Sequence, residues 1–337
     1  MSNRVKIKNN ENYPINYNTI SAVGLIALFV FIIITVIIKT NGRYENIMDN
    51  FDTAPLYGMD TNINISASGN MIFKDMTASV VEDFENAKGS YGIDLTDGID
   101  GDLNLAMLSS VRLNDNVMYI NDYIARDFTS SDEYLEGMIT NEFGNNIQST
   151  IIYADFNTGE LYDSTGLELG NFYSDPEAYS KINTRTIPAG EDIKTFIESI
   201  AMAIGKENIK VKKDGSDVYL YVDTEVTSDV ISNFPDSFFT DRGISKYTVI
   251  SSLKQIESKN DYTFPIRFEA HFVKNGSKYR IVESSFTGNL RYPFDKSFEE
   301  ILALGFGTDD GNLPEDYRFG VEGNIDLDLT YKCEYIY

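Results

Sequence analysis

Apolar and polar residues alternate at every second position through several stretches after residue 62. This period is typical of strands that bury one face and solvate the other. Turns rich in Asn, Asp and Gly separate the alternating runs, and these residues tolerate the positive φ angles of tight hairpins. Such turns lie at residues 114–116, 157–159, 214–216 and 275–276. The pattern predicts a mainly-β domain of roughly ten strands, an extended antiparallel sheet or half-barrel.

A few segments have the helical period instead. Residues 191–204 place four isoleucines and a phenylalanine on one stripe, and acidic residues in the first turn suit the helix dipole. Ser297 with Glu300 resembles a capping box that opens a helix over 298–304. Shorter helices are predicted at 131–138 and 228–234. Short amphipathic helices of this kind are expected to cover the concave face of the sheet.

A charge-free apolar run at residues 20–38 precedes the alternating pattern. At about 1.5 Å per residue it spans roughly 28 Å, close to the hydrocarbon thickness of a bilayer. Arg4, Lys6 and Lys8 lie before it, so the N-terminus is expected to stay in the cytoplasm. The run is longer than the apolar core of a signal peptide, and residues 39–42 lack a small-x-small cleavage pattern. We therefore expect an uncleaved anchor in the cell membrane.

This anchor predicts a single-pass protein in four parts. They are a short cytoplasmic tail at 1–19, the transmembrane helix at 20–38, a juxtamembrane linker at 39–61 and an extracytoplasmic β-rich domain at 62–337. Cys333 is the only cysteine, so the external domain has no intrachain disulfide. An exported domain without disulfides favours a prokaryotic envelope.

The charge balance limits the classes of partner that the chain is expected to bind. The chain has 28 basic and 52 acidic side chains and a formal net charge of −24. This charge repels phosphate backbones, so no nucleic-acid binding is expected. The acidic balance is otherwise typical of a well-solvated surface.

The order of segments resembles the LolA and LppX type of envelope lipoproteins. The segments that carry the likeness are a strand meander at 89–105 and 111–120, a helix at 192–204, strands at 209–211 and 218–222, a helix from 228 and a long hairpin at 264–290. The resemblance covers residues 62–331 and implies a half-barrel that binds acyl chains in its concave face. It implies no individual ligand-binding residue. The chain differs from these lipoproteins because a predicted transmembrane helix stands where they have a lipidated cysteine.

Catalytic motifs are not apparent in the sequence. A hydrolase triad needs a base beside its nucleophile, and His271 is the only histidine. It occupies the strand phase opposite to Phe268, Ala270 and Phe272, which predicts a surface or cross-strand histidine. There is no nucleophile elbow or phosphate-binding loop, and zinc is not expected with one histidine and one cysteine. We expect a protein that is not an enzyme.

Two acidic turns are candidates for calcium. Asp97, Asp100 and Asp102 lie among glycines in the first turn, and Asp309 and Asp310 lie in the second. Calcium takes six to eight oxygen ligands, which clustered carboxylates supply in part. The spacing lacks the ligand order of an EF-hand. Solvated turns are the alternative, and no other cofactor is expected.

These observations predict a membrane-anchored, extracytoplasmic, non-enzymatic protein that binds a lipid or another apolar ligand. The alternative is a scaffold that contacts other envelope proteins through its sheet face or acidic loops. A carboxylate-based hydrolase is a second alternative. Its cleft is usually lined with aromatic platforms, and this chain has no Trp.

Overall fold

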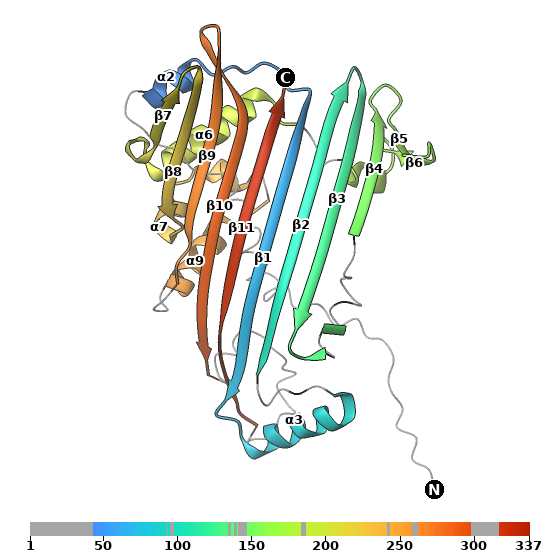
Figure 1. Ribbon diagram of the computed structural model, residues 1–337, viewed down its shortest axis with the longest axis vertical. Coiled ribbons are helices and arrows are strands. Elements are labelled where there is room, and N and C mark those ends of the chain that lie inside the picture. The colour runs from blue at the N-terminus through green and yellow to red at the C-terminus, as the bar shows by residue number, and fades with distance from the viewer. Residues whose placement is uncertain are drawn as a thin grey trace.

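The computed structural model describes residues 43–92, 94, 98–133, 136–137, 140, 147–182, 187–240, 243–257, 262–297 and 317–337. Within these ranges lies one antiparallel sheet of 11 strands, in the order β6-β5-β4-β3-β2-β1-β11-β10-β9-β8-β7 (Figure 1). The sheet is open, and β6 and β7 form its edges. The predicted mainly-β class with a large antiparallel sheet is confirmed.

The long strands lie in the middle of the sheet and the short ones at its edges (Figure 1). The strands are β1 (Gly58–Lys74), β2 (Ile99–Asn114), β3 (Val117–Ser130), β4 (Ile147–Asp155), β5 (Glu160–Asp163), β6 (Glu168–Asn171), β7 (Lys210–Asp214), β8 (Asp217–Glu225), β9 (Pro265–Asn275), β10 (Lys278–Lys296) and β11 (Gly320–Ile336). The helices are α2 (Arg43–Asp49), α3 (Ala78–Tyr91), α5 (Pro176–Ser180), α6 (Gly190–Ile204), α7 (Ser228–Ser232), α8 (Asp236–Thr240) and α9 (Lys246–Glu257), with a short 3-10 turn η1 (Lys206–Asn208).

The predicted hairpins are present. Asp115, Gly215 and Gly276 have φ angles of 54°, 61° and 63° in the turns that join β2 to β3, β7 to β8 and β9 to β10. The turn at 157–159 joins β4 to β5. Each expected tight turn therefore reverses the chain between paired antiparallel strands.

The first and last strands pair in the middle of the sheet. Strand β1 pairs with β11 from Gly58 opposite Ile336 to Lys74 opposite Gly320. Strand β1 also pairs with β2, and β11 pairs with β10. The pairing of β1 with β11 therefore joins strands β1 to β6 to strands β7 to β11 in a single sheet.

Helices cover one face of the sheet, which we call the inner face. On β9 this face carries Phe268, Ala270 and Phe272, all buried. Helices α2, α6, α7, α8 and α9 pack there in one large core with β8 to β11, and Figure 1 shows α6 behind the strands. The opposite, outer face looks toward the reader.

Helix α6 confirms the predicted amphipathic helix at 191–204. Its apolar stripe buries Ile193, Ile197 and Ile200 in the large core. Helix α7 confirms the helix expected from residue 228. Of the helix expected at 131–138, the structure describes helical residues at 133, 136 and 137.

A smaller core lies on the inner face near the other edge of the sheet. There Val111 of β2, Ile120 of β3, Ile152 of β4 and Leu161 of β5 are buried with Ala178 of α5. The inner face thus has two separate apolar cores, one near each edge of the sheet.

The segment expected as a juxtamembrane linker is partly built into the domain. Residues 43–49 form α2, and Tyr44, Ile47 and Met48 are buried in the large core with Phe51. Strand β1 then begins at Gly58, four residues before the predicted domain boundary. The apolar residues of α2 are separated by polar ones at helical spacing, so they pack on one side against the sheet.

Several sequence predictions fall outside the described residues. These are the cytoplasmic tail and transmembrane helix at 1–38, the helix at 298–304, Asp97, Asp309 and Asp310. In the part of the chain that the structure describes, no helix combines the length and apolar character needed to cross a membrane. The membrane location stays a prediction.

The single thiol provides a first testable prediction. Cys333 is buried on the inner face of β11, and burial raises the pKa of its thiol. Because the thiolate is the reactive form, we expect the native full-length chain to resist labelling by a disulfide reagent such as DTNB. Labelling should become complete once urea unfolds the domain.

A neighbouring position serves as the control. Thr330 is exposed on the outer face of the same strand, so a Thr330→Cys, Cys333→Ser variant should label rapidly without urea. Rapid labelling of Cys333 in the native chain would contradict the described burial of β11.

Candidate functional site

A strip of apolar side chains runs along the inner face between the two cores. On β1 the strip contains Ile65 and Ala67, which lie opposite Leu105 and Leu103 of β2. The next strand continues it, because Leu103 and Met107 face Phe128 and Ile124 of β3. On the other side of β1, Ile65 and Ala67 face Leu329 and Leu327 of β11. Two-residue alternation therefore places apolar residues of four adjacent strands on one surface.

Part of this strip is open to solvent. Leu327 and Leu329 of β11 and Ile63 of β1 belong to the large core, and Ile65, Ala67 and Met107 pack against its border. Leu103, Leu105 and Ile124 belong to neither core formed by the described residues, and Leu103 is 40% exposed. The strip thus changes from buried on β11 to half-buried on β3, and Leu103 of β2 is its exposed member.

The strip is long enough for an acyl chain. Along β2 it continues past Gly101 to Ile99, which lies opposite Met71 of β1. From Ile99 to Met107 it extends roughly 26 Å, at about 3.3 Å per residue. One leaflet of a bilayer has acyl chains about 15 Å long, half of a hydrocarbon core of about 30 Å. A ligand of this kind could lie along the strand without reaching either end of the strip.

Polar groups flank the strip toward the smaller core. Asp122 of β3 is buried on the inner face and accepts a hydrogen bond of 2.6 Å from the Ser109 hydroxyl. Arg126, the cross-strand neighbour of Leu105, is half-buried on the same face. An apolar surface with charged groups at its border suits an amphiphilic molecule, since its two ends differ in polarity.

The described calcium candidates do not form a metal site with other side chains. Asp100 and Asp102 lie on the outer face of β2, and no group of three or more His, Cys, Asp or Glu side chains gathers among the described residues. The Ser131 hydroxyl and then its backbone N–H lower the pKa of the Asp100 carboxyl. The N–H donates to Asp100 Oδ1 over 2.9 Å. Calcium at these turns stays a prediction.

His271 is a cross-strand histidine, as expected. It lies opposite Tyr219 of β8, and the two rings stack with centroids 4.5 Å apart. Its Nε2 atom is 2.7 Å from Oδ1 of Asp217. These contacts give the ring a structural place on the outer face.

Comparisons with known proteins leave the family open. No family model matches the chain, and no curated protein matches it. Among solved structures, a lipovitellin chain described for its lipid–protein interactions aligns with 82% of this chain at 7% identity and a TM-score of 0.22. This chain spans 25% of that lipovitellin chain.

Two Pseudomonas aeruginosa proteins align over 83% of this chain. OccK2 (OpdF) does so at 5% identity over 98% of its own length, and OpdQ at 6% identity over 99%. Both have a TM-score of 0.19. At these TM-scores the three likenesses do not establish a shared fold.

Proposed function

We propose that the protein is a non-enzymatic binding protein that holds a lipid or another apolar ligand along the inner face of its sheet. The observation that carries this proposal is the apolar strip on β2 and β3, where Leu103, Leu105 and Ile124 belong to neither core that the described residues form and Leu103 is exposed. Soluble surfaces rarely leave a contiguous apolar patch of this kind open unless it binds something. The membrane anchor at 20–38, which is a sequence prediction, would keep this surface close to a source of lipid.

The energetics favour a bound apolar molecule. Complete burial of a leucine side chain contributes about 1.5–3 kcal/mol. Leu103 is 40% exposed, so a ligand that covers it gains roughly 1 kcal/mol from this one residue. Smaller gains at the half-buried Leu105, Ile124 and Met107 would add to it. Several such contacts offset the loss of translational freedom on binding.

Photocrosslinking in cells tests the proposal. Cells that express the full-length chain are grown with a photoactivatable fatty acid and irradiated, and mass spectrometry locates the adducts. We expect adducts at inner-face residues of β1 to β3. Leu103→Asp should reduce them about tenfold, because a carboxylate in the strip must lose its hydration when the ligand binds.

Leu108→Asp is the matched control. Leu108 lies on the same strand and is 45% exposed, but it projects from the outer face. Its replacement should leave the adducts at β1 to β3 unchanged. Adducts confined to residues 20–38 would contradict the proposal. Recovery of a crosslinked envelope protein on the strip, with no lipid adduct, would favour the scaffold alternative.

A further inference from the structure

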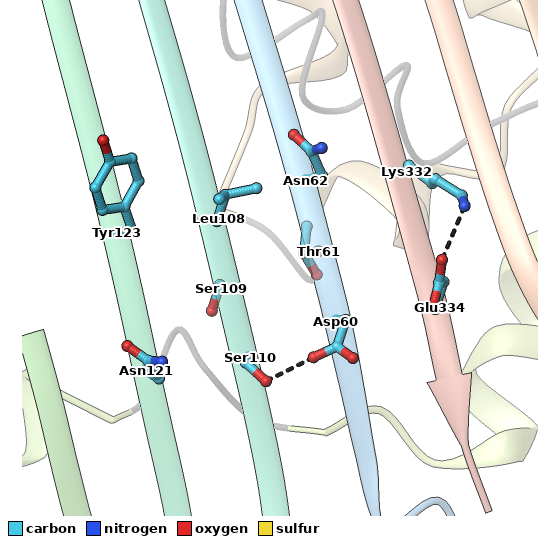
Figure 2. Close-up of a pocket in the computed structure, with 10 residues that line it drawn as sticks. All are labelled: Asp60, Thr61, Asn62, Leu108, Ser109, Ser110, Asn121, Tyr123, Lys332 and Glu334. Atoms are coloured by element: carbon cyan, nitrogen blue, oxygen red, sulfur yellow. Dashed lines mark hydrogen bonds and ion pairs between the residues drawn. The ribbon is translucent and has the colours of Figure 1, made fainter. Parts of the chain in front are cut away.

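The outer face carries a groove that is separate from the apolar strip. Two adjoining hollows of about 430 and 480 Å³ lie side by side on strands β11, β1, β2 and β3. Figure 2 shows the first of them, with Asp60, Asn62, Leu108, Asn121 and Tyr123 projecting from three neighbouring strands. Each hollow has a volume within the range of small-molecule sites.

The register of β11, β1, β2 and β3 places the outer-face side chains of the groove in four cross-strand rows. The rows are Glu334-Asp60-Ser110-Asn121, Lys332-Asn62-Leu108-Tyr123, Thr330-Asn64-Ala106-Ala125 and Asp328-Ser66-Asn104-Asp127. Successive rows are two residues apart along each strand. From the first row to the last the groove therefore extends roughly 20 Å. It suits an elongated ligand.

The floor of the groove is apolar and shallow. Ala106 and Ala125 pair across β2 and β3 in the third row, and their small side chains leave open space above the sheet there. Leu108 and Tyr123 stand beside them in the second row and offer an aliphatic and an aromatic surface. A tyrosine combines a flat apolar ring with a polar hydroxyl, so it can pack against a ligand and bind its polar rim.

Amide and hydroxyl groups border this floor. The Asn121 amide and the Tyr123 hydroxyl have no hydrogen-bond partner among the described residues. The Asn104 carbonyl oxygen accepts from Ser66 over 2.8 Å, which leaves its amide hydrogens for a ligand. Because an amide both donates and accepts, such groups suit hydroxyl groups, which do the same.

Charges in the first two rows are already compensated. Arg112 Nη2 lies 2.6 Å from Asp60 Oδ2 and lowers the pKa of this carboxyl, with the Ser110 hydroxyl adding to the effect. Lys332 Nζ lies 2.8 Å from Glu334 and 3.0 Å from Glu283. The groove thus has little net charge at its Tyr123 end.

These features disfavour anions, metal ions and wholly apolar ligands. Asp127 and Asp328 at the far end, with a chain of net charge −24, repel anions. The described residues provide no cluster that could hold a metal. The polar border would leave buried groups unpaired against a wholly apolar ligand. A neutral molecule with an apolar face and many hydroxyl groups matches the apolar floor and the amide border at the Tyr123 end.

We propose that the outer-face groove binds a neutral carbohydrate chain laid along strands β1 and β2. A sugar ring packs one apolar face on Tyr123 and Leu108, and its hydroxyl groups bond to Asn121, Asn62 and Asn104. The two faces of one sheet then hold chemically different ligands, and either function can fail without the other.

Binding of defined oligosaccharides tests this site. The full-length chain is purified in a detergent whose headgroup contains no sugar, and it is applied to an array of short linear oligosaccharides of glucose, mannose, galactose and N-acetylglucosamine. We expect retention of at least one neutral series. Tyr123→Ala should weaken its affinity about tenfold, through loss of the ring contact and the hydroxyl group.

Two further variants make the result specific. Ala106→Phe fills the floor with a residue that strands favour, so it should abolish binding while the domain stays folded. Tyr153→Ala removes another partly exposed tyrosine of the outer face, on β4 and outside both hollows, and should leave the affinity unchanged. Absence of binding to every oligosaccharide, or equal losses in Tyr123→Ala and Tyr153→Ala, would overturn the proposal. So would a protein or a second copy of the chain crosslinked in the groove.

Discussion

Replacement of Gly323 by alanine is expected to lower the free energy of unfolding by about 3 kcal/mol. Gly323 lies on β11, opposite Met71 of β1 and Phe294 of β10. A Cβ atom at this position would stand 2.0 Å from the carbonyl oxygen of Asn70 and 2.7 Å from the Phe294 ring. The ring can turn aside. The carbonyl group belongs to the backbone of β1, so the two strands must move apart.

Thiol labelling of Cys333 in increasing urea measures this effect in the full-length chain. Gly89→Ala is the matched control, because Gly89 is exposed on α3 and an added Cβ would meet no atom within 4 Å. Alanine favours a helix over glycine by about 1 kcal/mol, so this variant should be slightly more stable. If Gly323→Ala becomes labelled at the same urea concentration as the unmodified chain, β1 and β11 are not packed this closely.

Local sequence signals predicted the hairpins and the main helix well. The turn at 214–216 and the flanking alternation predict the position and the pairing of both strands of the β7–β8 hairpin, because a tight turn sets the register of the strands that it joins. Helix α6 was equally visible, because Ile193, Ile197 and Ile200 have a helical spacing over a long segment. In both cases the information lies within a few residues.

The hydrophobic pattern did not predict helices that are short or whose residues also suit a strand. Among the α9 residues whose burial is described, only Val249 and Leu253 are buried. The Tyr-Thr-Val-Ile sequence of this helix also suits a strand. Helix α2 lies in the polar stretch after the apolar run and is only seven residues long, so it was predicted as linker. Tertiary contacts with the sheet, which no local pattern contains, stabilise such short helices.

The candidate sites depend on strand order, which alternation alone does not specify. Asn62 lies between Leu108 and Lys332 in the groove, and Ile65 lies between Leu105 and Leu329 in the apolar strip. The alternation does indicate that Asn62 and Ile65 face opposite sides of β1. It does not show that β1 pairs with β11 at the far end of the chain. The sequence therefore predicts an apolar surface on one face of the sheet, whereas the residues of the candidate strip and of the polar groove depend on the register.

Asp52→Asn is expected to lower the free energy of unfolding by about 3 kcal/mol, because it removes a charged hydrogen-bond acceptor that is almost fully buried. The Asp52 side chain is 6% exposed, and its Oδ2 atom accepts from Arg280 Nε over 3.0 Å and lies 2.9 Å from Nη2. The Ala54 N–H donates to Oδ1 over 3.3 Å. This carboxylate fixes the segment after α2 to β10.

The matched control is an exposed carboxylate with similar partners. Asp223 pairs with Arg267 at 3.2 Å and with Lys210 at 3.3 Å, and its side chain is 47% exposed. Solvent screens such pairs, so Asp223→Asn should change the stability by less than about 1 kcal/mol. Equal effects of the two variants in urea titrations of Cys333 labelling would show that the Asp52 contacts add nothing beyond a surface ion pair.

The contribution of Asp52 should also depend on pH. Burial raises the pKa of its carboxyl, but hydrogen bonds from Arg280, the Ala54 N–H and Asn275 together outweigh burial and hold the pKa below its usual value. A carboxyl with a lowered folded pKa stabilises the protein above the unfolded pKa of about 3.9, and this stabilisation is lost as the pH falls through the folded pKa. We therefore expect the stability difference between the unmodified chain and Asp52→Asn to be constant above about pH 5 and to shrink below about pH 4. Tyrosine fluorescence in urea at each pH measures it, since thiol reagents react slowly in acid. A difference that grows toward acid pH would mean that burial dominates and that Asp52 is destabilising as an anion.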